Sequence, residues 1–217
     1  MIKFENTEVF NFDGALRGMR NPLNSWDKSD SKIGRDYKSQ LEIGPNDLKL
    51  AQNLIKAGSD HRKFLRQILV SVDITAPLYW WKEFDTYKVG TVANSCSTMH
   101  KIHAKKFELG DFSYEYLYDS SYYNDEPVNS YELLYHTINT LNYYRDKYIE
   151  TKEKIYWWQM IQLLPSSYNQ KRTVTLNYEV LRNIYGSRRN HKLDEWSIGF
   201  MEWINTLPYA EELIAYE

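Results

Sequence analysis

The sequence has 217 residues, 27 of them basic and 29 acidic, which gives a formal net charge of -2 at pH 7. This length suits one domain with a substantial core, and the near balance of charge gives no electrostatic indication of a nucleic acid or another polyanionic partner. The single cysteine, Cys96, cannot form an internal disulfide, and the chain shows neither a secretory signal at its start nor the roughly 20-residue apolar run of a membrane-spanning helix, so we expect a cytoplasmic protein.

The first part of the chain predicts strand, loop and two helices. Residues 2–12 place apolar side chains in a broken alternation, which is typical of one or two strands, and the polar residues 17–38 predict a loop. Pro45 begins a helix that Gly58 ends, and Ser59 is placed to cap a second helix. The buried face of that second helix is predicted to consist of Phe64, Leu65, Ile68 and Leu69.

The middle of the chain is less regular. Residues 78–100 have no clear period, and loops of this kind commonly carry function. Residues 110–127 are acidic and rich in tyrosine, and we expect a surface insertion there. Apolar positions at helical spacing then predict a long helix from Ser130 and a further helix over residues 151–163.

The C-terminal part has the clearest patterns. Residues 172–176 alternate like a strand, and Asn177 is placed to cap a helix that runs to about Gly186. A helical apolar face follows, formed by Trp196, Phe200, Trp203, Ile204 and Leu207. Because we find no internal repeat, we predict one α+β domain over residues 1–217.

Aromatic residues are unusually frequent, with 19 Tyr and 7 Trp. Such rings stack on flat ligands and dominate subunit interfaces, but they also fill cores and surfaces without any ligand. For the pairs Trp80-Trp81 and Trp157-Trp158 we favour a place in the core or in an interface, because paired tryptophans are more often core or interface residues than ligand platforms.

Several common chemistries lack their sequence patterns. No glycine-rich phosphate loop is present, and the pair His100 and His103 has no cysteine or carboxylate partner at a zinc-binding spacing, so we expect no metal site. Cys96 lies between two serines. It is either a nucleophile, if a basic group or a helix start lowers its pKa, or a small buried filler residue.

The block at residues 175–188, Thr-Leu-Asn-Tyr-Glu-Val-Leu-Arg-Asn-Ile-Tyr-Gly-Ser-Arg, resembles the block by which flavin-dependent thymidylate synthases (ThyX) are recognised. In that family a strand ends in Asn, a second Asn follows six residues later, and an Arg follows five residues after that. These positions fall here on Asn177, Asn183 and Arg188. Further matches are the Leu-Pro at residues 164–165 and the helix start at residues 194–198.

The resemblance continues toward the N-terminus, in the family's order, and covers residues 59–208. His61 matches the histidine of the family's Gly-His-x-Ser element. The family signature, Arg-His-Arg followed by Asn-Glu-x-Ser-x-Arg-Tyr, lines up with Tyr87-Lys88-Val89 and with residues 94–100, where Asn94 and Ser97 match.

The resemblance implies a ThyX-like fold, with a helical layer packed on a mainly antiparallel sheet, and a homotetramer. It also implies one-carbon transfer from methylenetetrahydrofolate to C5 of a pyrimidine deoxynucleotide such as dUMP, with reducing equivalents passing from NADPH through FAD. For FAD the implied contacts are His61, Lys88, Asn94, Asn177 and Asn183. For the nucleotide they are Ser95, Ser97, Arg188 and Arg189, with Arg188 and Ser97 as catalytic candidates.

Departures from the family pattern keep two other interpretations open. Only Lys88 supplies a cation where the family has Arg-His-Arg, and Ser95, Met99 and Ile161 replace a Glu and two Arg residues. These changes fit either an altered substrate or an inactive nucleotide-binding or protein-interaction module, such as a virus could encode. Without a ligand, Asn177 is a helix cap, Arg188 and Arg189 form an exposed helix end, and His61 caps or packs.

Overall fold

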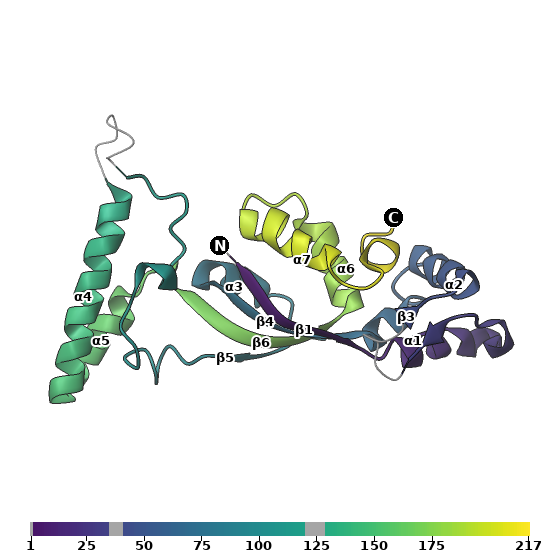
Figure 1. The fold of residues 1–217 in the computed structure, drawn as a ribbon, viewed down its shortest axis with the longest axis horizontal. Coiled ribbons are helices and arrows are strands. Elements are labelled where there is room, and N and C mark those ends of the chain that lie inside the picture. The colour runs from purple at the N-terminus through teal and green to yellow at the C-terminus, as the bar shows by residue number, and fades with distance from the viewer. Residues whose placement is uncertain (1, 35–40, 120–128) are drawn as a thin grey trace. The chain divides into compact units, whose positions relative to one another are not determined.

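The computed structural model describes residues 2–34, 41–119 and 129–217 (Figure 1). Its contacts divide the chain into two compact units. One, which we call the α6 unit, consists of Ile2–Ile74, Thr86–Asn94 and Thr173–Glu217. The other, which we call the α4 unit, consists of Thr75–Asp85 and Ser95–Arg172. The single-domain assignment stays a prediction, and each unit is described by itself.

A four-stranded sheet has the strand order β1-β4-β6-β5. Its strands are β1 Lys3–Phe10, β4 Leu69–Pro77, β5 Val92–Ser95 and β6 Asn169–Asn177. A two-stranded antiparallel pair is formed by β2 Lys32–Ile33 and β3 Leu41–Glu42. Together with the helices this is the predicted α+β fold with a mainly antiparallel sheet, which is confirmed.

The α6 unit places helices on its part of the sheet (Figure 1). Its longer helices include α1 Phe12–Arg20, α2 Pro45–Lys56, α6 Tyr178–Arg188, the π-helices η5 Glu195–Phe200 and η6 Ala210–Ile214, and α7 Met201–Asn205. The predicted aromatic face is confirmed, because Trp203 stacks on Phe4 of β1 with ring centroids 4.7 Å apart. Trp203 also donates a hydrogen bond from Nε1 to Thr7 Oγ1, so β1 and α7 share one aromatic core.

Two sequence predictions in the α6 unit are wrong. The predicted loop at 17–38 contains the end of α1 and the short helices η1 Asn21–Leu23 and η2 Trp26–Lys28. The predicted helix after Ser59 is instead the 3-10 helix η3 Lys63–Gln67, and β4 begins at Leu69. The alternating burial of Leu69–Pro77 explains the second error, since these residues satisfy a strand period once neighbouring strands are present.

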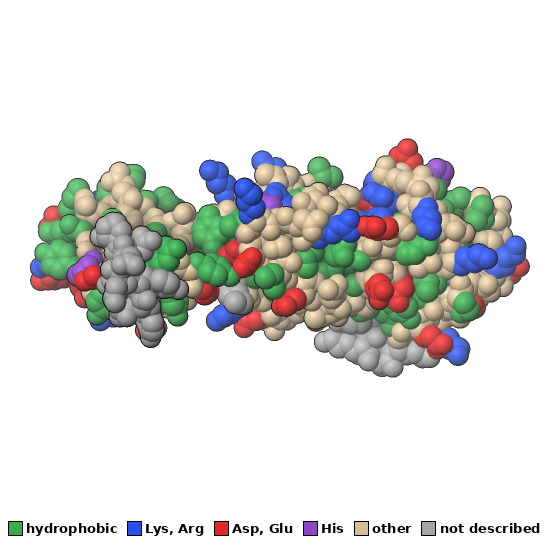
Figure 2. Space-filling view, turned by 90° about the horizontal axis from the view of Figure 1, so that it is seen from above, with side chains coloured by type: hydrophobic (Ala, Val, Ile, Leu, Met, Phe, Trp, Pro, Cys, Tyr) green, Lys and Arg blue, Asp and Glu red, His purple; other side chains and the backbone are tan. Residues whose placement is uncertain are grey.

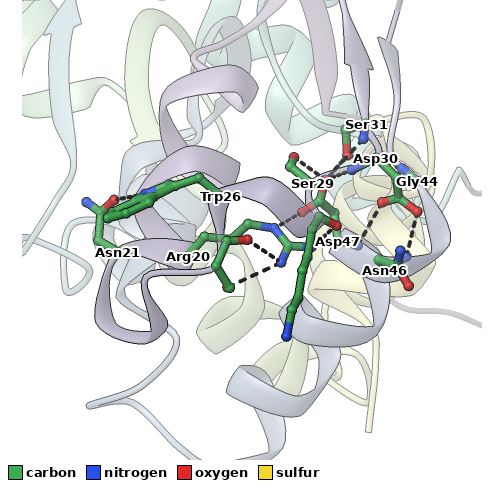
Figure 3. Close-up of polar contacts among 11 residues, drawn as sticks. Arg20, Asn21, Trp26, Ser29, Asp30, Ser31, Gly44, Asn46 and Asp47 are labelled. Atoms are coloured by element: carbon green, nitrogen blue, oxygen red, sulfur yellow. Dashed lines mark hydrogen bonds and ion pairs between the residues drawn. The ribbon is translucent and has the colours of Figure 1, made fainter.

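A buried ion pair fixes the segment that was predicted as a loop (Figure 3). Arg20 donates from Nε to Asp47 Oδ1 at 2.5 Å, and both side chains are almost fully buried. The other carboxylate oxygen, Oδ2, accepts hydrogen bonds from the hydroxyls of Ser29 and Ser31 at 2.8 and 2.6 Å. Burial raises the pKa of Asp47, but the hydrogen bonds from Ser31, Ser29 and Arg20 and the charge of Arg20 together lower it below its ordinary value.

The α4 unit is built around a pair of helices. Its helices are α3 Leu78–Phe84, α4 Ser130–Thr151 and α5 Lys154–Leu163. The helices predicted from Ser130 and over 151–163 are confirmed, whereas part of the irregular stretch 78–100 is α3 and β5. The core of this pair contains Ile102, Phe107, Phe112, Leu134, Ile138, Leu141 and Met160. Hydrophobic side chains are also visible on the surface of the part of the molecule that carries α4 (Figure 2).

The predicted insertion at 110–127 lies partly outside the described residues, which stop at Asp119 and resume at Asn129. Trp80 and Trp81 are buried in the α4 unit, as their sequence context favoured. Among the described residues no helix is long and apolar enough to cross a membrane.

Candidate functional site

The start of α6 is fixed by the residue that the sequence singled out. Asn177 ends β6 in an extended conformation, and its side-chain Oδ1 accepts a hydrogen bond from the Val180 backbone N–H at 3.0 Å. The predicted helix cap is therefore confirmed. Asn177 is buried, and its side-chain Nδ2 has no hydrogen-bond acceptor among the residues that the structure describes.

A loop over the start of α6 brings Gly90 against this amide. Gly90 has a φ of +76°, and a Cβ placed there would lie 2.8 Å from Asn177 Nδ2 and 3.3 Å from Val180 Cγ2. Only glycine adopts this backbone conformation at low cost while leaving the amide its space. The same loop carries Lys88, whose side chain is exposed.

Replacing Gly90 by alanine should lower the free energy of unfolding by about 1 to 2 kcal/mol, because alanine pays the cost of the left-handed conformation. Urea denaturation followed by tryptophan fluorescence measures this loss. Gly186 provides the control, since a Cβ there meets nothing within 4 Å. Gly186→Ala lies within α6 and should stabilise the protein by up to about 1 kcal/mol. Equal effects of the two substitutions would contradict the requirement for a left-handed conformation at Gly90.

At the other end of α6, Arg188 is held between two aromatic rings. Its Nε donates to Tyr87 Oη at 2.9 Å. Its guanidinium carbon lies 5.2 Å from the ring centroid of Trp196, and the Tyr87 and Trp196 rings meet edge to face. Cation–π attraction and the hydrogen bond together restrict the side chain, so its guanidinium plane has a fixed direction.

Asn177 and Arg188 lie on the same side of α6. They are eleven residues apart, which is about three full turns and about 16 Å along the axis. The loop follows that side, since Gly90 contacts Asn177 and Tyr87 contacts Arg188. The structure thus brings together three predicted site residues, Asn177, Lys88 and Arg188, along a surface that we call the loop side of α6.

Asn183 and Arg189 lie on a different side of α6. They line a cleft of about 220 Å³ between this helix and the C-terminal residues 214–217. Arg189 pairs with Glu217 at 2.5 Å, and Arg182 Nη1 donates to two backbone carbonyls of the C-terminal segment at 2.9 and 2.5 Å. Burial, and next the nearby charge of Arg62, lower the pKa of Arg182. The predicted roles of Asn183 and Arg189 stay predictions.

His61 is exposed in a turn, where its backbone N–H donates to the Gly58 carbonyl. Its neighbour Arg62 contacts α6 instead, donating from Nε to both carboxylate oxygens of Glu179 at 3.1 and 3.0 Å. Glu179 lies in the first turn of α6, where a negative charge interacts favourably with the helix dipole and stabilises the helix. Sequence reasoning missed this ion pair and also the contact of Tyr87 with Arg188, because both join segments that are far apart in the chain.

The signature segment 94–100 is exposed along its first residues. Asn94 and Ser95 end β5, the edge strand next to β6. Cys96 is exposed rather than a buried filler residue, and its backbone pairs with Lys171 and with the Gln170 side chain. Ser97 Oγ accepts a hydrogen bond from the His100 N–H at 2.9 Å, which makes it a turn residue in the described chain.

Within the described residues, no three His, Cys, Asp or Glu side chains gather as a metal site would require. No protein-family model matches the chain, and no curated protein matches it.

Solved structures do resemble it. Thymidylate synthase X (ThyX) from Helicobacter pylori, solved with FAD and dUMP, has a TM-score of 0.68 and 16% identity, and the match covers 99% of this chain and 97% of that chain. A flavin-dependent thymidylate synthase ThyX from the same organism, complexed with FAD and dUMP, has a TM-score of 0.66, 16% identity, and coverage of 99% and 98%. The chain therefore has a ThyX-like fold.

Proposed function

We propose that this protein binds FAD and transfers a one-carbon unit to C5 of a pyrimidine deoxynucleotide, with dUMP as the first substrate to test. The observation that carries the proposal is the loop side of α6, where an amide donor and a fixed guanidinium lie about 16 Å apart along one helix face. The ThyX-like fold supports it, because the two similar ThyX structures contain FAD and dUMP.

The residues of the loop side fit the polar edge of a flat ring. Asn177 Nδ2 lacks a described acceptor, and an amide donor of this kind hydrogen-bonds the edge of a flavin. When bound, the flavin would supply hydride chemistry, with NADPH as the reductant and methylenetetrahydrofolate as the one-carbon donor. Arg188 would stabilise the negative charge that develops on the pyrimidine during alkylation.

The proposal also includes the other residues that the sequence predicted to contact FAD or the nucleotide. His61, Lys88, Asn94 and Asn183 are proposed for FAD, and Ser95, Ser97 and Arg189 for the nucleotide. The proposed assembly is a homotetramer in the cytoplasm. Exposed apolar side chains on α4 and α5 support a subunit contact; they are Leu133, Tyr135, Tyr143, Ile149, Ile155, Trp158 and Leu163.

A second candidate function has one specific observation in its favour. Tyr87 stands at the position that lines up with the first Arg of the family's Arg-His-Arg, and its hydroxyl accepts the hydrogen bond from Arg188 Nε. A guanidinium engaged in this way has one N–H fewer for a nucleotide. The alternative is therefore a ThyX-like module that binds a nucleotide or a protein without catalysis.

Titration of the purified full chain with FAD, followed by dUMP, tests the proposal. We expect saturable flavin binding, seen as a shift in flavin absorbance, and tighter dUMP binding once FAD is bound. The matched variant is Asn177→Ser, because serine keeps the helix cap but removes the Nδ2 donor. It should weaken FAD binding about tenfold with little loss of stability, since one hydrogen bond is removed. Protein that cannot be loaded with FAD would favour the non-catalytic module.

A further inference from the structure

The α4 unit contains a pocket of about 370 Å³ that none of the predicted site residues lines. Three segments form it: residues 99–103, the end of α4, and the first turns of α5. Trp157 Nε1 donates to the Met99 carbonyl at 2.9 Å, and the His103 ring packs edge to face on Tyr148 with centroids 4.9 Å apart. These contacts fasten the 99–103 segment to both helices, so the pocket has fixed walls.

The chain reversal between α4 and α5 directs two lysines to this pocket. Lys152 ends α4 in a left-handed conformation, with φ +61°, and its N–H donates to the Tyr148 carbonyl at 2.9 Å. Lys154 begins α5, and its Nζ lies 5.8 Å from the Trp158 ring centroid. Neither lysine forms an ion pair with a residue that the structure describes. Two lysines that lie two residues apart therefore line the pocket, and neither has a described counter-charge.

Two histidines complete a polar lining that contains no carboxylate. His100 and His103 line the pocket with Lys152 and Lys154, and none of the described lining residues is Asp or Glu. The Nδ1 atom of His103 is buried and has no hydrogen-bond partner among the described residues. A buried polar atom of this kind costs free energy unless a ligand or a water satisfies it. The lining is thus complementary to an anion.

The other walls are aromatic and apolar. Trp157 and Tyr148 are half-buried, and Met99 is exposed, all at the pocket. Aromatic faces next to clustered cations suit a ligand that joins an anionic group to a flat ring.

We propose that this pocket binds an aryl phosphate, that is, a phosphate monoester of a flat aromatic ring. Lys152, Lys154, His100 and His103 would surround the phosphate. Four donor side chains match a phosphate, which has three acceptor oxygens, better than they match a single carboxylate group. The volume admits a ring beside Trp157 and Tyr148. The inference does not rest on the proposed flavin chemistry, because its test uses neither flavin nor nucleotide.

Isothermal titration calorimetry of the full chain with phenyl phosphate tests the proposal. Separate titrations use inorganic phosphate and phenol. We expect saturable binding of phenyl phosphate with a Kd below about 1 mM, weaker binding of inorganic phosphate and no detectable binding of phenol. Raising the KCl concentration should weaken binding, since exposed charges are screened. Absence of saturable phenyl phosphate binding, or equal binding of phenol, would overturn the proposal.

Matched variants locate the site. Lys152→Gln with Lys154→Gln should weaken phenyl phosphate binding at least tenfold. Lys82→Gln with Lys106→Gln removes the same charge from exposed positions of the α4 unit outside the pocket and should leave the Kd within about twofold. Equal losses in the two pairs would assign the binding to net charge and refute the pocket. His103→Phe keeps the ring packing on Tyr148, and it should also weaken binding while the melting temperature shows that the protein stays folded.

Discussion

Replacing Asp47 by alanine should lower the free energy of unfolding by about 3 to 5 kcal/mol, the typical cost of removing one partner from a buried ion pair. The carboxylate is fully buried and binds Arg20, Ser29 and Ser31, so its removal leaves a buried guanidinium without its counter-charge. Urea denaturation followed by tryptophan fluorescence measures the change. The loss should appear as a lower urea midpoint.

The control lies on the same helix as Arg20. Asp13 pairs with Arg17 at 2.8 Å, but both side chains are mostly exposed. Asp13→Ala should therefore cost at most about 1 kcal/mol. Similar losses for the two variants would show that the Asp47 pair adds no more than a surface pair.

The Asp47 carboxylate should also make the free energy of unfolding depend on pH. Because the folded-state pKa of Asp47 is lowered from the ordinary 3.8, its stabilisation is present above that value and is lost as the pH falls through the folded-state pKa. The wild-type protein should therefore lose stability in this acidic range. Asp47→Asn should remove part of this dependence, and an unchanged slope would contradict the assignment.

Replacing Arg188 by alanine should weaken dUMP binding by about ten- to a hundredfold while FAD binding is retained, because a charged hydrogen-bond donor is lost. Calorimetric titration of the FAD-loaded protein measures both affinities. Arg188→Lys should recover only part of the loss, since an ammonium lacks the planar fork. Unchanged dUMP affinity in Arg188→Ala would remove this residue from the site.

Two further variants separate the candidate functions. Arg189 lies on another side of α6 and pairs with Glu217, so Arg189→Ala tests its proposed nucleotide contact: a loss of dUMP affinity would support that contact, and an unchanged affinity would confine the site to the loop side. Tyr87→Phe removes the hydroxyl that accepts from Arg188. If Tyr87 keeps Arg188 from a nucleotide, this variant should bind dUMP more tightly than the wild type, which would favour the non-catalytic module.

The matches to the ThyX pattern predicted the fold correctly but grouped some site residues wrongly. The order of weak matches from His61 to Arg188 predicted a ThyX-like fold, which the structural likeness confirms at 16% identity. The same matches grouped Asn177 with Asn183 and Arg188 with Arg189. The helix period separates both pairs, because residues six apart, or adjacent, on a helix point in different directions.

The sequence by itself determined three helices, α2, α4 and α5, and the start of a fourth, α6. The stripes of α2, α4 and α5 and the cap at Asn177 are local features, since helix periodicity and capping depend on residues within a few positions of one another. Only the tertiary structure decided the strand β4, the buried Asp47 network and the contact of Tyr87 with Arg188. Each joins residues that are distant in the chain, and their pairing follows from burial and sheet formation, which no local pattern records.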